Sequence, residues 1–185
     1  QNKAFWAMHL IIALLAHEVS HVFSAILLNI EFTKVKITLF GFNLNADLDN
    51  LSHAKKIILF FAGPACNLCL YFGFRNTEYF KFANINLFLA YMNLIPIVPL
   101  DGGNICKTVL EFFLDTRTVS GYITMTNAFF ILYFIIIIHV YKNYLYFLLV
   151  CMGLKGIVDE NRYLLEKSII NRYNLLSKAE KEKNL

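Results

Sequence analysis

The sequence HEVSH, residues 17–21, lies in the middle of an apolar stretch that covers residues 4–30. On an α-helix its two histidines are one turn apart on the same face, where they can bind one zinc ion. Glu18 directly follows the first histidine and can take a proton from a water molecule near the metal. The apolar stretch is long enough to cross the hydrocarbon core of a bilayer, which is about 30 Å thick. Two imidazoles and a carboxylate are costly at that depth unless they are satisfied, so the sequence predicts a metal site inside a membrane protein.

The composition agrees with a membrane protein. Hydrophobic residues make up 58% of the 185 residues and charged residues only 16%, with a mean hydropathy of +0.54, whereas soluble domains are about 25% charged. The net charge of +4 forms no basic stripe, which excludes nucleic acid as a predicted partner. The length predicts one membrane-embedded core, residues 1–158, followed by a cytoplasmic amphipathic helix and tail, residues 159–185. The four cysteines lie in or beside apolar stretches and are interpreted as free thiols.

The apolar stretches predict an all-α polytopic membrane protein with about five transmembrane helices. The predicted spans are residues 4–30, 57–74, 80–99, 122–141 and 144–158. Residues 31–56 differ, because polar and apolar side chains alternate over residues 34–39 and Gly41 can supply a turn. We predict a small β-hairpin or re-entrant loop near the active site there. Its edge could pair with an extended substrate strand, and the alternative is a plain connecting hairpin.

The third predicted span is broken near its end by Pro96 and Pro99, which cannot both lie inside a regular helix. The turn that follows, at residues 101–103, presents the carboxylate of Asp101. Irregular backbone at membrane depth is tolerated where it is buried in protein or lines a watery cavity. Asp101 is therefore the preferred third metal ligand, and the alternative is that it only caps the next helix. The other candidate ligands are Asp47, Asp49, Glu111, His9, His53 and His139.

The second predicted span contains Gly63, Pro64 and, at membrane depth, Asn67. Small residues allow helices to approach closely, and an amide in this position needs a hydrogen-bonding partner. Asn67 could hold the backbone of another element or simply join two helices. Lysines and arginines are concentrated in loop 31–56, in the connector before residue 120 and in the tail, so we expect these segments on the cytoplasmic side.

HEVSH in one span and NLIPIVPLDGG, residues 93–103, in another resemble the site-2 protease family of intramembrane zinc metalloproteases. The second motif, the segment Ala62-Gly63-Pro64 and the tail are similar to the bacterial branch that includes stage IV sporulation protein FB. Members of this branch also carry an extra first span, and some have a nucleotide-sensing domain; the resemblance of residues 1–185 covers neither, and we expect further residues upstream of Gln1.

The resemblance implies that His17, His21 and Asp101 bind Zn²⁺ and that Glu18 is the general base and later the proton donor in peptide hydrolysis. It also implies substrate contacts, which we assign to Asn93, Pro96 and Asn67.

The function implied is regulated intramembrane proteolysis in a bacterial cell membrane. In the sporulation branch the substrate is the pro-sequence of a sigma-factor precursor, and partner membrane proteins inhibit the protease. The competing interpretation is a non-enzymatic metal transporter or membrane scaffold. Glu18 argues against that alternative, because transport has no evident need for a carboxylate beside the first histidine.

Overall fold

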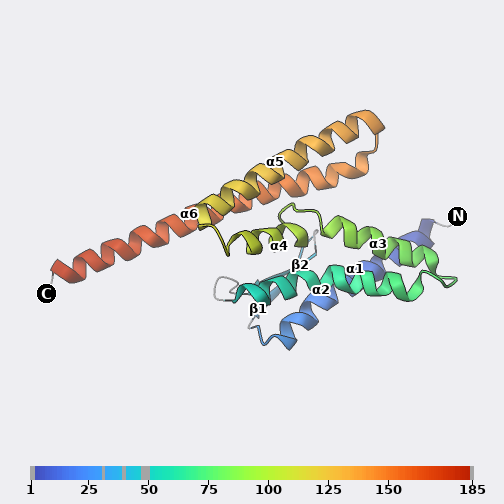
Figure 1. Cartoon of the computed structure of the whole chain (residues 1–185), viewed down its shortest axis with the longest axis horizontal. Coiled ribbons are helices and arrows are strands. Elements are labelled where there is room, and N and C mark those ends of the chain that lie inside the picture. The colour runs from blue at the N-terminus through green and yellow to red at the C-terminus, as the bar shows by residue number, and fades with distance from the viewer. Residues whose placement is uncertain (1–2, 31, 39–40, 47–50, 184–185) are drawn as a thin grey trace. The chain divides into compact units, whose positions relative to one another are not determined.

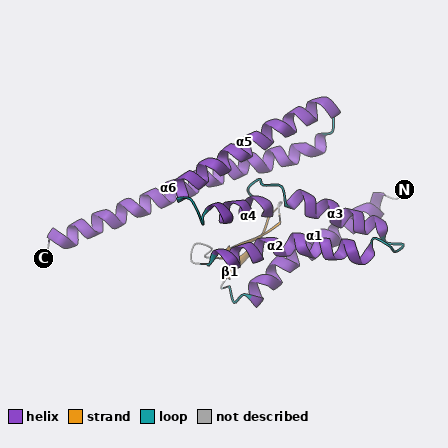
Figure 2. Cartoon of the chain, viewed as in Figure 1, coloured by secondary structure: helices purple, strands orange, loops and turns teal. Residues whose placement is uncertain are grey.

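The computed structural model describes residues 3–30, 32–38, 41–46 and 51–183, most of which are helical (Figure 2). The chain forms two compact units. The first consists of Gln1–Pro96 and Leu100–Phe112, and the second of Ile97–Pro99 and Phe113–Leu185. Chain segments therefore alternate between the units around residues 97–99.

The first unit contains helices and a strand pair (Figure 1). Its described elements are α1 (Lys3–Leu27), β1 (Phe32–Thr38), β2 (Gly41–Ala46), α2 (His53–Phe74), α3 (Phe80–Asn93) and α4 (Asp101–Leu110). Helix α2 is central, because it packs against α1, α3 and α4, and α1 also packs against α3. Several fully buried side chains of these helices are small, namely Ala13, Ala25, Ala83 and Ala90. Small side chains let the helix backbones come close together, which is typical of helix packing in membranes.

Helix α1 contains neither glycine nor proline in its 25 residues. At about 1.5 Å per residue it is long enough to cross a bilayer. Its large apolar side chains are mostly on the outside, and Val19, Phe23 and Ile26 are 57–60% exposed. In water such an apolar surface would favour aggregation, whereas lipid is a suitable environment for it.

Strands β1 and β2 pair antiparallel, with Val35 opposite Leu44 and Ile37 opposite Phe42. They lie in the segment for which a hairpin or re-entrant loop was predicted. The residues that would connect them, 39–40, lie outside the described residues, as do residues 47–50. A position of the strand pair near the active site stays a prediction.

The predicted break in the third span is confirmed. Helix α3 ends at Asn93 and α4 begins at Asp101, with Pro96 and Pro99 between them. A Cβ atom on Gly102 would lie 2.3 Å from the carbonyl oxygen of Leu94. Glycine is therefore required where the first turn of α4 packs against the end of α3.

The second unit is a helical hairpin of α5 (Thr116–Tyr141) and α6 (Phe147–Lys183), joined through a short 3₁₀ turn, η2 (Tyr144–Tyr146) (Figure 1). Asp115 caps α5 by accepting hydrogen bonds from the backbone of Arg117 and Thr118, each at 3.1 Å. Lys142, with a φ of 53°, ends α5 in the left-handed conformation. The buried side chain of Asn127 accepts from the backbone N–H of Val98 and donates to its carbonyl, which fastens residues 97–99 to α5.

The five predicted spans are not confirmed. In the described part of the chain, three helices are long and apolar enough to cross a membrane: Ala4–Leu27, His53–Phe74 and Thr116–Tyr141. Helix α3 has only 14 residues, because the chain leaves the helix before Pro96. The predicted fifth span and the predicted tail helix are one continuous helix, α6, so the predicted domain boundary at residue 158 falls inside it. Composition changes there, but nothing in the backbone interrupts the helix.

Candidate metal centre

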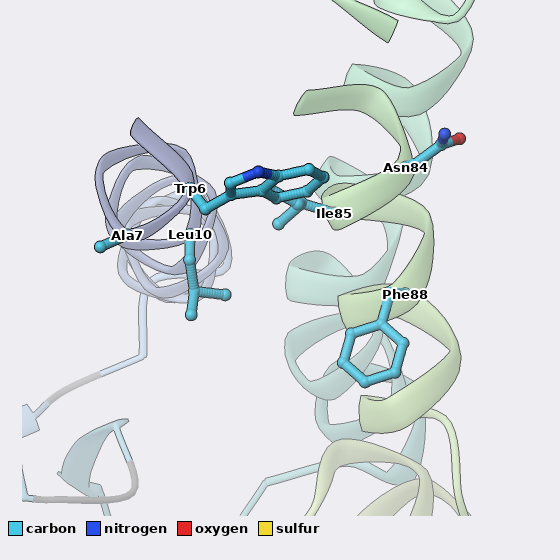
Figure 3. A pocket seen from close by; sticks show the side chains of 6 residues that line it. All are labelled: Trp6, Ala7, Leu10, Asn84, Ile85 and Phe88. Carbon is cyan, nitrogen blue, oxygen red and sulfur yellow. The ribbon is translucent and has the colours of Figure 1, made fainter. Parts of the chain in front are cut away.

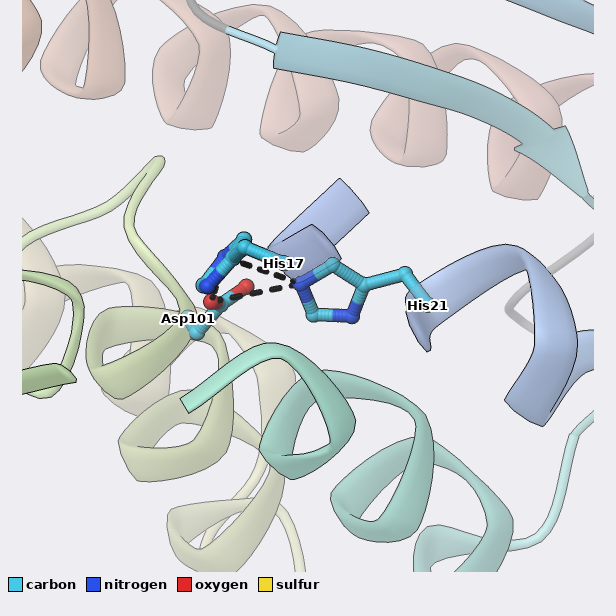
Figure 4. A group of neighbouring side chains, drawn as sticks. All are labelled: His17, His21 and Asp101. Carbon is cyan, nitrogen blue, oxygen red and sulfur yellow. Dashed lines mark hydrogen bonds and ion pairs between the residues drawn. The ribbon is translucent and has the colours of Figure 1, made fainter. Parts of the chain in front are cut away.

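Three predicted ligands meet in the first unit (Figure 4). His17 and His21 extend from α1, one turn apart, and Asp101 is the first residue of α4. Oδ2 of Asp101 lies 3.1 Å from Nε2 of His17 and 3.4 Å from Nε2 of His21, and the two Nε2 atoms are 3.2 Å apart. His17 is 3% exposed. The sequence could not place α4 beside α1, and the packing of both helices on α2 explains how it happens.

These three atoms form a nearly equilateral triangle, and its dimensions fit zinc. A tetrahedral zinc ion with ligand distances of about 2.0–2.1 Å holds its ligand atoms about 3.3–3.4 Å apart. Oδ2 of Asp101 is also buried without a hydrogen bond, which is costly unless a cation satisfies it. Three protein ligands leave one tetrahedral position open, as in catalytic zinc sites.

The fourth residue that shapes the site is Gly63 of α2. A Cβ atom there would lie 2.4 Å from Nε2 of His21 and 2.5 Å from Nε2 of His17. No side chain larger than hydrogen can therefore stand at this position while the two imidazoles converge. From the sequence this glycine could be assigned only to close helix packing, because its proximity to the histidines depends on the tertiary structure.

Each imidazole is oriented by a partner on α2. Nδ1 of His21 lies 2.8 Å from the carbonyl oxygen of Leu59, and Nδ1 of His17 lies 2.6 Å from Oδ1 of Asn67. Such contacts to the remote ring nitrogen orient histidine ligands in metal sites. Asn67 is fully buried. It has no exposed surface with which to touch a substrate in this structure, so we reassign it from substrate contact to support of His17.

Sequence reasoning missed Asn86 of α3, which is fully buried and accepts a hydrogen bond of 2.8 Å from Asn67. The available signal was an amide inside an apolar helix, but nothing in its spacing relates it to HEVSH. The remaining predicted site residues are partly exposed in the first unit. Glu18 is half-buried directly after His17, and Asn93 donates to the carbonyl of Leu89 in its own helix. Pro96 is half-buried after the end of α3, and substrate contact by Asn93 and Pro96 stays a prediction.

The alternative third ligands that the structure describes lie elsewhere. Nδ1 of His9 is bound to the carbonyl of Phe5 at 2.7 Å. Nδ1 of His53 lies 4.0 Å from Oε2 of Glu111, and this contact links the start of α2 to the end of α4. His139 is exposed on α5 of the second unit. Asp47 and Asp49 lie outside the described residues.

A groove between α1 and α3 is separate from this centre, because none of its lining residues is a predicted ligand (Figure 3). It has a volume of about 400 Å³ and is almost wholly apolar. Its lining residues are Trp6, Ala7, Leu10, Asn84, Ile85 and Phe88. None of these lining side chains is an acid, a base or a usual metal ligand, so the candidate site remains the His–His–Asp centre.

Comparison with known proteins finds similarity to a peptidase family. The model of peptidase family M50 matches residues 72–138, which include Asp101 but not HEVSH. The chain is 32% identical over 123 residues to a Synechocystis protein whose name describes it as a proposed zinc metalloprotease. That match covers 57% of this chain and 32% of the relative, so the chain corresponds to about a third of the relative's length.

The fold is that of a solved site-2 protease from Methanocaldococcus jannaschii, with a TM-score of 0.67. The match covers 83% of this chain and 76% of that one at 18% identity. The family model and the curated relative therefore support peptidase family M50 for this chain, and the structural match shows the site-2 protease fold.

Proposed function

We propose that this chain is an intramembrane zinc endopeptidase. The observation that carries the proposal is the convergence of His17, His21 and Asp101, three atoms at zinc-ligand separations, with Glu18 next to the first histidine. Support also comes from the apolar helices long enough to cross a membrane and from the likeness to family M50.

When bound, zinc would polarise the peptide carbonyl and would lower the pKa of a water molecule, so that the water gives up a proton readily and becomes a better nucleophile. Glu18 would accept a proton from the attacking water as the water oxygen bonds to the carbonyl carbon. The C–N bond then breaks, and Glu18 returns the proton to the departing amine. His17, His21 and Asp101 would hold the metal, and the partners of the two histidines on α2 keep the imidazoles in place.

The substitution Glu18→Gln tests this assignment. It removes the base while keeping the size of the side chain, so cleavage should fall by about 10²–10⁴-fold. Zinc content should stay at the parental level, because Glu18 is not a ligand. Glu78→Gln, an exposed acid between α2 and α3, is the control and should cleave normally. A metal transporter or scaffold has no cleavage to lose, so this variant also separates the two functions; undiminished cleavage in Glu18→Gln would reject Glu18 as the base.

We also propose a substrate class and a setting. The resemblance of residues 93–103 and the tail to the sporulation branch makes the pro-sequence of a sigma-factor precursor the first substrate to test. We place the protein in a bacterial cell membrane with several spans, where inhibitory membrane proteins regulate it. Co-expression with a sigma-factor precursor, scored for shortening of the precursor, tests the substrate. Absence of shortening in a strain where a generic membrane-tethered peptide is cut would reject this substrate while leaving the protease intact.

A further inference from the structure

A continuous chain of hydrogen bonds leads from the metal centre into α3. Nδ1 of His17 lies 2.6 Å from Oδ1 of Asn67, and Nδ2 of Asn67 donates to Oδ1 of Asn86 at 2.8 Å. Nδ2 of Asn67 also faces the carbonyl oxygen of Ala13 at 3.4 Å, and Nδ2 of Asn86 donates to the carbonyl of Phe82 at 2.9 Å. The three linked side chains are at most 3% exposed, so water does not compete for these bonds.

A backbone carbonyl determines which atom donates and which accepts in each of these hydrogen bonds. A carbonyl oxygen can only accept a hydrogen bond, so the NH₂ group of Asn86 must face Phe82. Its Oδ1 then faces Asn67, which must present its own NH₂ group in return. Oδ1 of Asn67 is consequently left facing His17. Because that oxygen also only accepts, His17 must carry its proton on Nδ1. Turning either amide over would place two acceptors or two donors against each other in a buried site.

The position of this proton determines which ring nitrogen of His17 can bind a metal. With the proton on Nδ1, neutral His17 presents a lone pair at Nε2, the atom that points toward Asp101 and His21. In water, neutral histidine prefers the opposite arrangement, with the proton on Nε2, where it would block a metal. His21 needs only one contact for the same purpose, the carbonyl of Leu59. His17 depends on an amide that can turn over, and that amide is in turn fixed from α3.

We propose that Asn86 is a positioning residue of the metal centre: through Asn67 it holds His17 with its proton on Nδ1 and Nε2 ready for the metal. The proposal rests on the proposed zinc site and extends it to a third helix. Asn86 acts only through Asn67 and touches neither metal nor substrate.

Zinc affinity and the protonated nitrogen of His17 test the proposal in the purified full chain without substrate. Asn86→Leu removes the partner of Asn67 at similar volume, so zinc affinity, measured by competition with a chelator, should fall about tenfold or more. Asn86→Asp keeps an oxygen that accepts from Asn67, and its neutral carboxyl group can donate an O–H to the carbonyl of Phe82 as the amide does, so this variant should stay near the parental affinity. Asn84→Leu, on the exposed face of the same helix, is the control and should not change it.

The second measurement is ¹⁵N NMR of the metal-free protein. The parent and Asn86→Asp should show His17 protonated on Nδ1, and Asn86→Leu should lose this signature, which a merely structural effect on packing would not do. Parental zinc affinity with an unchanged signature in Asn86→Leu would overturn the proposal. If that variant does not fold, a His17 in the parent that has its proton on Nε2 and none on Nδ1 would overturn it as well. Because neither measurement needs proteolysis, failure of the protease assignment is recognised separately, by the absence of cleavage.

Discussion

Position 63 must be glycine for the candidate metal centre to form, because the imidazoles of His17 and His21 occupy the space where a side chain would be. The nearest atoms are those of the two rings, and each ring is held by its own partner on α2. Neither ring can therefore move away without losing a buried hydrogen bond. A single methyl group at this position changes the chemistry of the site without altering any ligand.

The substitution Gly63→Ala should therefore eliminate zinc binding. The added Cβ would lie 2.4–2.5 Å from ring atoms of both histidines, which forces the rings apart. Gly73→Ala is the matched control in the same helix, because nothing lies within 4 Å of its added Cβ. The measurement is the zinc content of both purified variants by elemental analysis. Zinc at the parental level in Gly63→Ala would show that the rings do not converge over this glycine.

In the second unit, helix α6 lies very close to the backbone of Val98 at Gly156. A Cβ on Gly156 would lie 1.8 Å from the carbonyl oxygen of Val98 and 2.5 Å from Nδ2 of Asn127. The same amide also donates to the carbonyl of Gly153 at 3.3 Å. The contact therefore joins α5, α6 and residues 97–99, and its nearest atom is a backbone carbonyl oxygen, which moves less readily than the end of a flexible side chain.

Gly156→Ala should consequently destabilise the protein by about 1–3 kcal/mol or more. The measurement is the Tm in detergent followed by circular dichroism. Gly121→Ala in α5 adds the same methyl group where nothing lies within 4 Å and should leave Tm unchanged or slightly raised. Equal Tm values for the two variants would contradict the described packing of α5 on α6.

Strands β1 and β2 form a two-stranded sheet, so in the described part of the chain each has an outer edge without a strand partner. A peptide bond in a helix is shielded, so a substrate must unwind before hydrolysis, and its freed N–H and C=O groups then need partners in an apolar cleft. We expect the substrate to pair with this sheet.

Replacing Val35 or Ile37 by proline removes a backbone donor of β1. Cleavage should fall while zinc content and expression stay close to parental values. If both variants cleave at the parental rate, the strand pair is only a connector between α1 and α2.

For the whole molecule, we expect loop 31–56 and the tail in the cytoplasm, because lysines and arginines are concentrated there. The test places single cysteines at Ser52 and Ser177 in a variant whose four native cysteines are replaced by serine. A membrane-impermeant thiol reagent added to sealed cells should react with neither position, and should react with both after lysis. Ready labelling from outside would overturn this orientation.

Sequence reasoning selected the three residues that meet in the structure because their signals are local. The spacing of His17 and His21 fixes their common face, and the prolines before Asp101 mark a helix start. It missed Asn86 and the role of Gly63, which depend on how α1, α2 and α3 pack together. The predicted boundary at residue 158, which follows a change in hydropathy, falls inside α6. A change in hydropathy indicates where a helix leaves the lipid, but it does not indicate where the helix itself ends.

The central claim is that His17, His21 and Asp101 together bind one zinc ion. The most direct measurement is the metal content of the purified parent and of His17→Ala, His21→Ala and Asp101→Ala, with His53→Ala as a histidine control outside the centre. The parent and the control should contain one zinc ion per chain, and the three ligand variants far less. A parent without zinc, or an Asp101→Ala variant with its full complement, would contradict the account.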